Sequence, residues 1–245
     1  MICLCNDINV PLNYFFCTNH SLFIKETIKL YLRSYGVKFD FCQLFIQYSE
    51  DKRVISVILR YNNLVFVVSD IYDDELCTFL QGFSECEITA GTDLSARFNG
   101  KICYVMQKPG EPYVSVCDKI KNINSAKEIS SLVTKGYSCE KAEDFFLNTA
   151  HQLRHNLISV NGLYAENSLS CVVSLSNTQD EYSLITFVYT EEYFRGKGFA
   201  KEILSYSCID PGKIYLLLCE EHNLKFYLKC GFLQAETCFI FELRG

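Results

Sequence analysis

The segment 195–200 reads Arg-Gly-Lys-Gly-Phe-Ala and combines two glycines with positive charge. Gly196 and Gly198 allow the backbone to turn sharply and to approach a bound group, because glycine has no Cβ atom. Apolar residues at helical spacing follow this segment, so the amides of a helix N-terminus are expected to point into the same space. Together with the side chains of Arg195 and Lys197, these amides predict a binding site for a doubly charged anion such as a pyrophosphate.

The elements around this segment form a strand–loop–helix–strand unit. An apolar run at 183–190 precedes the loop, Asp-Pro-Gly at 210–212 ends the helix, and a second apolar run follows at 214–219. This length fits a parallel crossover with both strands buried. A dinucleotide fingerprint would need a third glycine where Lys201 stands, and a P-loop would need Gly-Lys-Ser/Thr. A plain glycine turn between strand and helix is the remaining alternative.

Two motifs in the C-terminal half carry a resemblance to a known family. The first is Arg195-x-x-Gly198-x-Ala200 after a strand, and the second is Phe226-Tyr-Leu-Lys-Cys-Gly-Phe232. In this order and spacing they resemble the acyl-CoA motif pair of the GNAT superfamily of N-acyltransferases.

The resemblance covers about 113–245 and is tightest over 183–232. It implies an α/β fold with an α+β mixed sheet, the GNAT-like acyltransferase fold, for this half. The implied reaction moves an acetyl group from acetyl-CoA to a primary amine, on a small molecule or a protein, by direct attack. The alternative is a non-catalytic acyl-CoA-binding or regulatory module.

The resemblance also implies which residues hold the acyl donor. In the family, backbone groups of the first central strand bind the pantetheine arm and polarise the thioester, and these positions match Val188 and Tyr189. The loop amides would hold the pyrophosphate. The residues concerned are Arg195, Gly196, Lys197, Gly198, Phe199 and Ala200.

Two catalytic roles follow from the same resemblance. Tyr227 matches the family's tyrosine, whose phenol, with an ordinary pKa of ~10, can protonate the leaving thiolate. Its alternative role is packing beside Phe226 and Phe232. Glu181 lies near the position where many members place an acid that deprotonates the amine through water. The competing acids are Asp180, Glu191 and Glu192.

One position departs from the family pattern. Glu220 stands seven residues before Tyr227, where the family often has asparagine. Asn223 is the nearby residue predicted to take over that contact with the donor.

The N-terminal half loosely repeats the order of elements. We expect a helix over 18–35, strands over 44–48, 54–60 and 64–69, a short helix over 73–83 and a strand over 102–107. Four carboxylates, Asp70, Asp73, Asp74 and Glu75, occupy the position of a phosphate loop and would repel a pyrophosphate. This half is therefore predicted to be either a degenerate GNAT-like domain or an unrelated α/β accessory domain, which shapes the acceptor pocket or a dimer contact.

The proline-containing segment 108–112 is the predicted linker between domains 1–108 and 113–245. We expect the second domain to open with a strand at 113–117.

Composition limits the class of protein. The chain has 245 residues, 49% of them hydrophobic, and a net charge of −6, which argues against a nucleic-acid partner. The N-terminus lacks the basic start of a signal peptide, and the apolar runs are too short to span a bilayer, so we expect a cytoplasmic protein with no membrane partner. A homodimer is a further expectation. No Cys-x-x-Cys pair occurs, and Gln152 stands between His151 and His155 where a protease motif needs Glu. No metal site is predicted.

Overall fold

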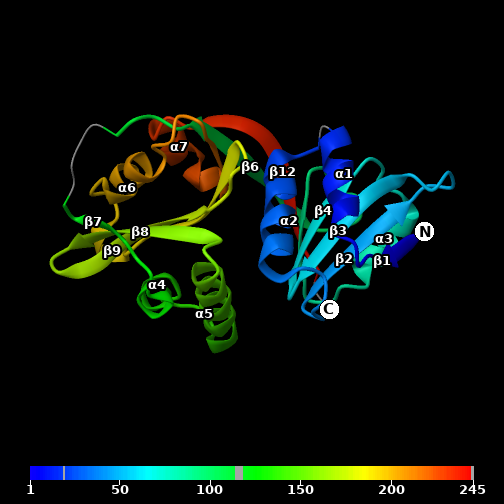
Figure 1. The fold of residues 1–245 in the computed structure, drawn as a ribbon, viewed down its shortest axis with the longest axis horizontal. Coiled ribbons are helices and arrows are strands. Elements are labelled where there is room, and N and C mark those ends of the chain that lie inside the picture. The colour runs from blue at the N-terminus through cyan, green and yellow to red at the C-terminus, as the bar shows by residue number, and fades with distance from the viewer. Residues whose placement is uncertain (19, 114–117, 244–245) are drawn as a thin grey trace. The chain divides into compact units, whose positions relative to one another are not determined.

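The computed structural model describes residues 1–18, 20–113 and 118–243. They form two compact units (Figure 1). Unit 1 comprises Met1–Met106, Leu218–Lys225 and Gln234–Gly245, and unit 2 comprises Gln107–Leu217 and Phe226–Leu233. The chain thus passes from unit 1 to unit 2 and returns twice near its C-terminal end. The division into domains 1–108 and 113–245 stays a prediction.

Unit 1 is a sheet with helices on both faces. Its strands are β1 (Ile2–Leu4), β2 (Cys42–Tyr48), β3 (Val54–Tyr61), β4 (Leu64–Ser69), β5 (Glu87–Ala90) and β12 (Leu233–Glu242), and its helices are α1 (Asn9–Cys17), α2 (Leu22–Tyr35) and α3 (Asp74–Gln81). The strands lie in the order β1-β2-β3-β4-β5-β12. Only the pairing of β4 with β5 is parallel among those described within this unit.

The two faces of the unit 1 sheet bury alternate residues of the same strands. Ile24 and Ile28 of α2 pack with Leu59 on one face. Leu76 and Leu80 of α3 pack with neighbouring Ile58 and Val65 on the other. The continuous apolar run of β3 and β4 follows from burial on both sides.

The C-terminal strand β12 belongs to unit 1. Phe239 pairs with Ala90 and Glu242 with Glu87, so β12 runs antiparallel beside β5. The sheet of the N-terminal unit is therefore completed by residues from the far end of the sequence.

Unit 2 is built from β7 (Ile120–Asn122), β8 (Ile158–Ala165), β9 (Ser168–Ser176), β10 (Tyr182–Thr190) and β11 (Ile214–Glu220), in the order β7-β8-β9-β10-β11. Its helices are α4 (Ala126–Val133), α5 (Cys139–Arg154), the 3-10 turn η1 (Glu192–Phe194), α6 (Phe199–Ser207) and α7 (Glu221–Lys229). The pairs β7–β8, β8–β9 and β9–β10 are antiparallel, whereas β10 and β11 run parallel. β11 and α7 contribute residues to both units, as does β6 (Gly100–Pro109). Most of the predicted strand 113–117 falls outside the described residues.

The predicted linker 108–112 is hydrogen-bonded to the turn between α6 and β11. The amide of Gly110 donates to the carbonyl of Lys213 at 2.9 Å, and that of Glu111 to the carbonyl of Cys208 at 3.0 Å. The ammonium of Lys108, which is 8% exposed, donates to the carbonyl of Cys230 at 3.3 Å. This segment is therefore anchored inside unit 2.

Gly110→Ala is expected to destabilise the protein by about 1–3 kcal/mol, because a Cβ atom there would overlap the backbone carbonyl of Asp210, which a turn cannot move freely. Urea unfolding measures the loss. Gly212→Ala is the matched control, since its Cβ atom would lie 3.3 Å from Oδ1 of Asp210, a side-chain atom that can rotate away. Equal midpoints for the two variants would contradict this packing.

Candidate functional site

The loop between β10 and α6 turns on two glycines with left-handed backbone. Gly196 has a φ of 76° and Gly198 a φ of 87°, a region that favours glycine. A Cβ atom at either position would meet nothing within 4 Å. The backbone conformation, and not crowding, therefore requires glycine here, and the surface beside the loop is open.

No side chain among the described residues caps the first-turn amides of α6. Gly198 is the N-cap residue and offers no side chain, and within the described residues no acceptor is found for the amides of residues 198–201. By contrast, α2, α3, α4 and α5 each have an N-cap side chain that accepts from a first-turn amide: Ser21, Asp73, Ser125 and Ser138. Uncapped amides with the positive end of the helix dipole form an anion-binding site.

The strand leading into this loop becomes exposed halfway along. Residues 183–185 of β10 are buried, Thr186 is exposed, and residues 187–190 are half-buried although β10 lies between β9 and β11. The register with β9 shifts between Ile185 and Phe187. Within the described residues of unit 2, the parallel pairing with β11 covers residues 182–184. Val188 and Tyr189, the predicted donor-binding positions, therefore lie beyond the described pairing with β11 and are half-buried.

Arg195 and Lys197 lie against aromatic rings of the same region. Nε of Arg195 donates to the carbonyl of Thr190 at 3.2 Å, and its guanidinium carbon is 5.9 Å from the ring centroid of Tyr189. Nζ of Lys197 is 3.8 Å from the ring centroid of Tyr193. These contacts hold both cations close to the open amides and keep their charge available to an anion.

A hollow of about 450 Å³ lies beside this loop in unit 2. Lys119 and Lys121 line it together with Lys197 and Phe199, while Asp118 and Glu166 contribute negative charge. Another wall residue, Phe194, stacks on Phe199 with ring centroids 5.4 Å apart.

Sequence reasoning did not connect Lys119 and Lys121 with the loop. The available signal was the alternation Lys-Ile-Lys at 119–121, in which Ile120 is buried and both lysines are exposed on one side of β7. That alternation locates the lysines on one face of a strand but does not name the strand's neighbours.

Tyr227 lies on α7, the helix that follows β11. Its ring is half-buried and contacts those of Phe226, 5.0 Å away between centroids, and Phe232, 5.8 Å away. Its carbonyl accepts from the amide of Phe232 at 3.1 Å. These contacts fix the ring and are compatible with either predicted role, so the catalytic assignment stays a prediction.

Glu220, at the departure from the family pattern, has Lys101 as its partner, and both residues belong to unit 1. Nζ of Lys101 donates to Oε1 of Glu220 at 2.7 Å, and this hydrogen bond lowers the pKa of the Glu220 carboxyl. Asn223 is exposed on the first turn of α7. Its role toward the donor stays a prediction.

Glu181 is exposed immediately before β10, at the opposite end of the strand from the loop. Nine residues of strand place it roughly 30 Å from Thr190. Of the competing acids, Glu191 forms an ion pair with Lys135, Glu192 opens η1, and Asp180 precedes Glu181 in the turn. The identity of the base stays a prediction.

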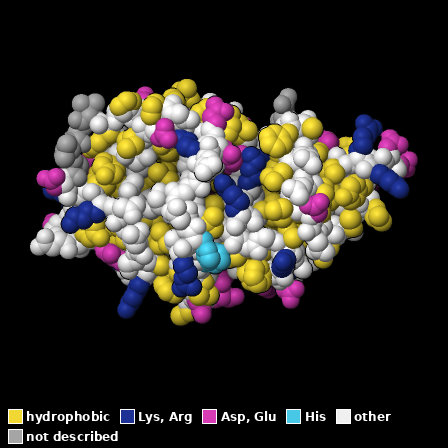
Figure 2. All heavy atoms as spheres, in the orientation of Figure 1, with side chains coloured by type: hydrophobic (Ala, Val, Ile, Leu, Met, Phe, Trp, Pro, Cys, Tyr) yellow, Lys and Arg dark blue, Asp and Glu magenta, His cyan; other side chains and the backbone are white. Residues whose placement is uncertain are grey.

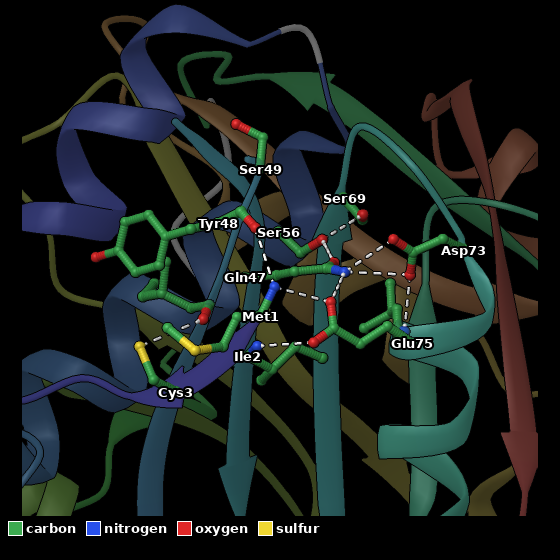
Figure 3. A network of polar contacts seen from close by, with 12 residues as sticks. Met1, Ile2, Cys3, Gln47, Tyr48, Ser49, Ser56, Ser69, Asp73 and Glu75 are labelled. Carbon is green, nitrogen blue, oxygen red and sulfur yellow. Dashed lines mark hydrogen bonds and ion pairs between the residues drawn. The ribbon is translucent and has the colours of Figure 1, made fainter. Parts of the chain in front are cut away.

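In unit 1, a polar network occupies the segment between β4 and α3, which corresponds to the glycine loop between β10 and α6 in unit 2 (Figure 3). After β4, the side chain of Asp73 caps α3 by accepting from the amide of Leu76 at 2.8 Å. Nε2 of buried Gln47 donates to both carboxyl oxygens of Asp73, at 3.1 and 3.0 Å, and to Glu75 at 3.0 Å. Oε1 of Gln47 accepts from Ser56 at 2.6 Å. Because carboxylates already occupy this helix N-terminus, an anion would be repelled there, as the sequence indicated.

Among the described residues, His, Cys, Asp and Glu form no group of three or more that could hold a metal ion. The cysteines in the described part of the chain are all free, and burial raises the pKa of Cys103 and Cys171 to about 11. Such thiols are poor nucleophiles at neutral pH.

No helix within the described ranges combines the length and apolar character needed to cross a membrane. The face in Figure 2 shows acidic and basic side chains interspersed with apolar ones.

Comparison with known proteins shows which known fold the chain shares. No family model matches the sequence, and no curated protein matches it. Among solved structures, a GCN5-related N-acetyltransferase from Sphaerobacter thermophilus aligns with a TM-score of 0.60 at 12% identity over 100% of this chain and 96% of that chain. A GNAT-family acetyltransferase from Colwellia psychrerythraea gives 0.59 at 12% identity, with 100% of both chains covered. A tandem GNAT protein from the clavulanic acid biosynthesis pathway gives 0.59 at 10% identity, covering 100% of this chain and 99% of that one.

The chain has the GNAT acetyltransferase fold. The predicted mixed α/β architecture and its GNAT-like character are confirmed. Because these alignments span the whole chain, the GNAT likeness includes the N-terminal half and favours the degenerate-domain prediction over an unrelated domain. The glycine loop of unit 2 has no side-chain cap at the start of α6, whereas in unit 1 Asp73 caps α3.

Proposed function

We propose that the protein is an acyltransferase that moves an acetyl group from acetyl-CoA to a primary amine. The observation that carries the proposal is the uncapped N-terminus of α6 next to the exposed half of β10. A diphosphate linked to an extended thioester arm fits this pair of features, because the amides of residues 198–201 suit the phosphates and the strand edge suits the arm.

The residues have separate tasks in this proposal. Amides of the loop bind the pyrophosphate of the donor, with Arg195 and Lys197 adding charge. Backbone groups of Val188 and Tyr189 orient the thioester, and an N–H donor stabilises the oxyanion that develops as the amine attacks the carbonyl carbon. As the new C–N bond forms and the C–S bond breaks, the phenol of Tyr227 donates its proton to sulfur. An acid receives the proton that the ammonium loses through water; Glu191 and Glu192 follow β10 at its loop end, whereas Glu181 lies at the other end of the strand.

The second candidate is a non-catalytic acyl-CoA-binding module. The observation that favours it is the ion pair of Glu220 with Lys101, which engages the residue at the position where the family often has asparagine. Such a module would keep the donor site of unit 2 and lack turnover.

Incubation with acetyl-CoA and a broad panel of primary amines tests both candidates. We expect saturable binding in calorimetry together with equal amounts of acetylated amine and free CoA. Free CoA is best quantified by chromatography, because the exposed thiols of Cys17 and Cys139 would react with thiol reagents. Binding without any product across the panel would favour the module, and the absence of binding would contradict both candidates.

A further inference from the structure

Unit 1 contains a hollow of about 290 Å³ that the proposed reaction does not use. Ser69 at the end of β4, Gly91 after β5, Ile24 on α2 and Glu236 on β12 line it. It therefore lies beyond the carboxyl ends of the parallel strands β4 and β5, with α2 and α3 on opposite faces of the sheet. Open α/β sheets bind ligands in this location.

His20, in the wall of the hollow, is held in one orientation by two neighbours. Its Nε2 lies 2.7 Å from Oδ1 of Asp70 and 3.1 Å from the hydroxyl of Tyr14. The Tyr14 hydroxyl gives its own hydrogen to the carbonyl of Ile55 at 3.0 Å, so its oxygen accepts from His20. In the tautomer that places the proton on Nε2, Nδ1 of the ring is a hydrogen-bond acceptor. Within the described residues no partner of Nδ1 is found.

Glu236, also in the wall, is fixed through one carboxylate oxygen. Oε1 accepts from the amide of Leu22 at 3.0 Å, at the start of α2. In the described part of the chain no hydrogen bond is found for Oε2. Nearby Lys25 is buried and donates to the carbonyls of Phe15 and Thr18, at 3.3 and 2.7 Å. None of the described residues lining the hollow is a lysine or arginine.

The residues that line the hollow therefore include an imidazole and a carboxylate, beside the apolar side chains of Ile24 and Val67. A primary ammonium group supplies three N–H donors and a positive charge from one atom, and its alkyl chain suits the apolar wall. An anion would be repelled by Glu236, and an alcohol offers one donor. We propose that this hollow binds a small primary alkylammonium ion. The hollow belongs to unit 1, whereas the proposed acyl-donor loop belongs to unit 2, and the volume of the hollow is at the small end for ligand pockets.

Methyl NMR of the full chain with n-butylammonium tests the proposal, with the Cδ1 methyl of Ile24 as the reporter. This methyl group belongs to the wall of the hollow, so its shift reports binding there and not at an acceptor site in unit 2. We expect a saturable shift with n-butylammonium, at least about tenfold weaker binding of n-butanol, and none of butyrate.

Glu236→Gln is expected to weaken n-butylammonium binding at least about tenfold, since the charged acceptor is lost. The glutamine oxygen can still accept from the amide of Leu22, so α2 keeps this contact. Glu50→Gln, the same exchange in an exposed turn of unit 1, is the matched control and should bind like the parent.

A second variant tests the place of binding. The Cβ atom of Gly91→Leu would lie 3.6 Å from Cβ of Ser21 and 4.0 Å from Cδ1 of Ile24, so it fits the wall while the rest of its side chain takes up space in the hollow. We expect loss of the Ile24 shift with an unchanged unfolding midpoint. Equal binding of n-butanol, an unaffected Glu236→Gln variant, or no saturable shift would each overturn the proposal. Thioester turnover plays no part in this readout, so either proposal can fail without the other.

Discussion

Gly198→Val is expected to raise the KM for acetyl-CoA at least about a hundredfold. A β-branched residue is strongly disfavoured at a φ of 87°, so the loop would leave its present path and turn the first amides of α6 away from the phosphates. Each hydrogen bond to a charged group contributes about 1.5–3 kcal/mol, and each 1.4 kcal/mol is about a factor of ten. Losing two such bonds accounts for the expected change. Steady-state kinetics with varied acetyl-CoA, together with calorimetry, measures it.

Gly136→Val is the matched control for this experiment. Gly136, in the turn between α4 and α5, has the same φ of 87° and also has open space at its Cβ position. It should lose a similar amount of stability and keep its KM. An unchanged KM for Gly198→Val, or an equal rise in both variants, would mean that the loop does not bind the donor.

Tyr227→Phe is expected to lower kcat by about 10²–10⁴-fold with little change in the KM for acetyl-CoA, because a general acid acts on the leaving sulfur and not on the phosphates. The phenyl ring can keep the contacts with Phe226 and Phe232, so the helix should stay folded. The measurement is kcat at saturating donor over a series of pH values.

Tyr137→Phe, which removes a phenol from an exposed turn of unit 2, should leave kcat unchanged. If Tyr227→Phe also retains the full kcat at every pH, Tyr227 has only the packing role that its ring contacts allow.

The backbone geometry of the glycine loop could be predicted because it is local. Glycines with positive φ, the start of α6 and the end of β10 all lie within residues 183–207, and backbone sterics alone determine how they meet. The same holds for the Asp73 cap in unit 1, where a carboxylate just before a helix has one natural partner, the first-turn amides.

Helix starts and long-range strand pairings could not be predicted in this way. The helix α1 was not predicted, because Pro11 argues against a helix in the sequence. Pro11 stands in the first turn of α1, where the missing amide hydrogen is tolerated. The predicted helix over 18–35 begins only at Leu22, because Ser21 caps it. Lys119 and Lys121 reach the loop through the pairing of β7 with β8, which is a long-range contact.

The pairing of β12 with β5 has a consequence for synthesis on the ribosome. β5 ends at Ala90, whereas its antiparallel neighbour begins to pair at Phe239. During translation, more than half of the polypeptide must be synthesised after β5 before β12 can cover the edge of β5. An uncovered edge strand is a template for aggregation. Nascent chains that stall before residue 234 are therefore expected to bind chaperones that recognise unpaired strands, however well the rest of unit 1 has formed.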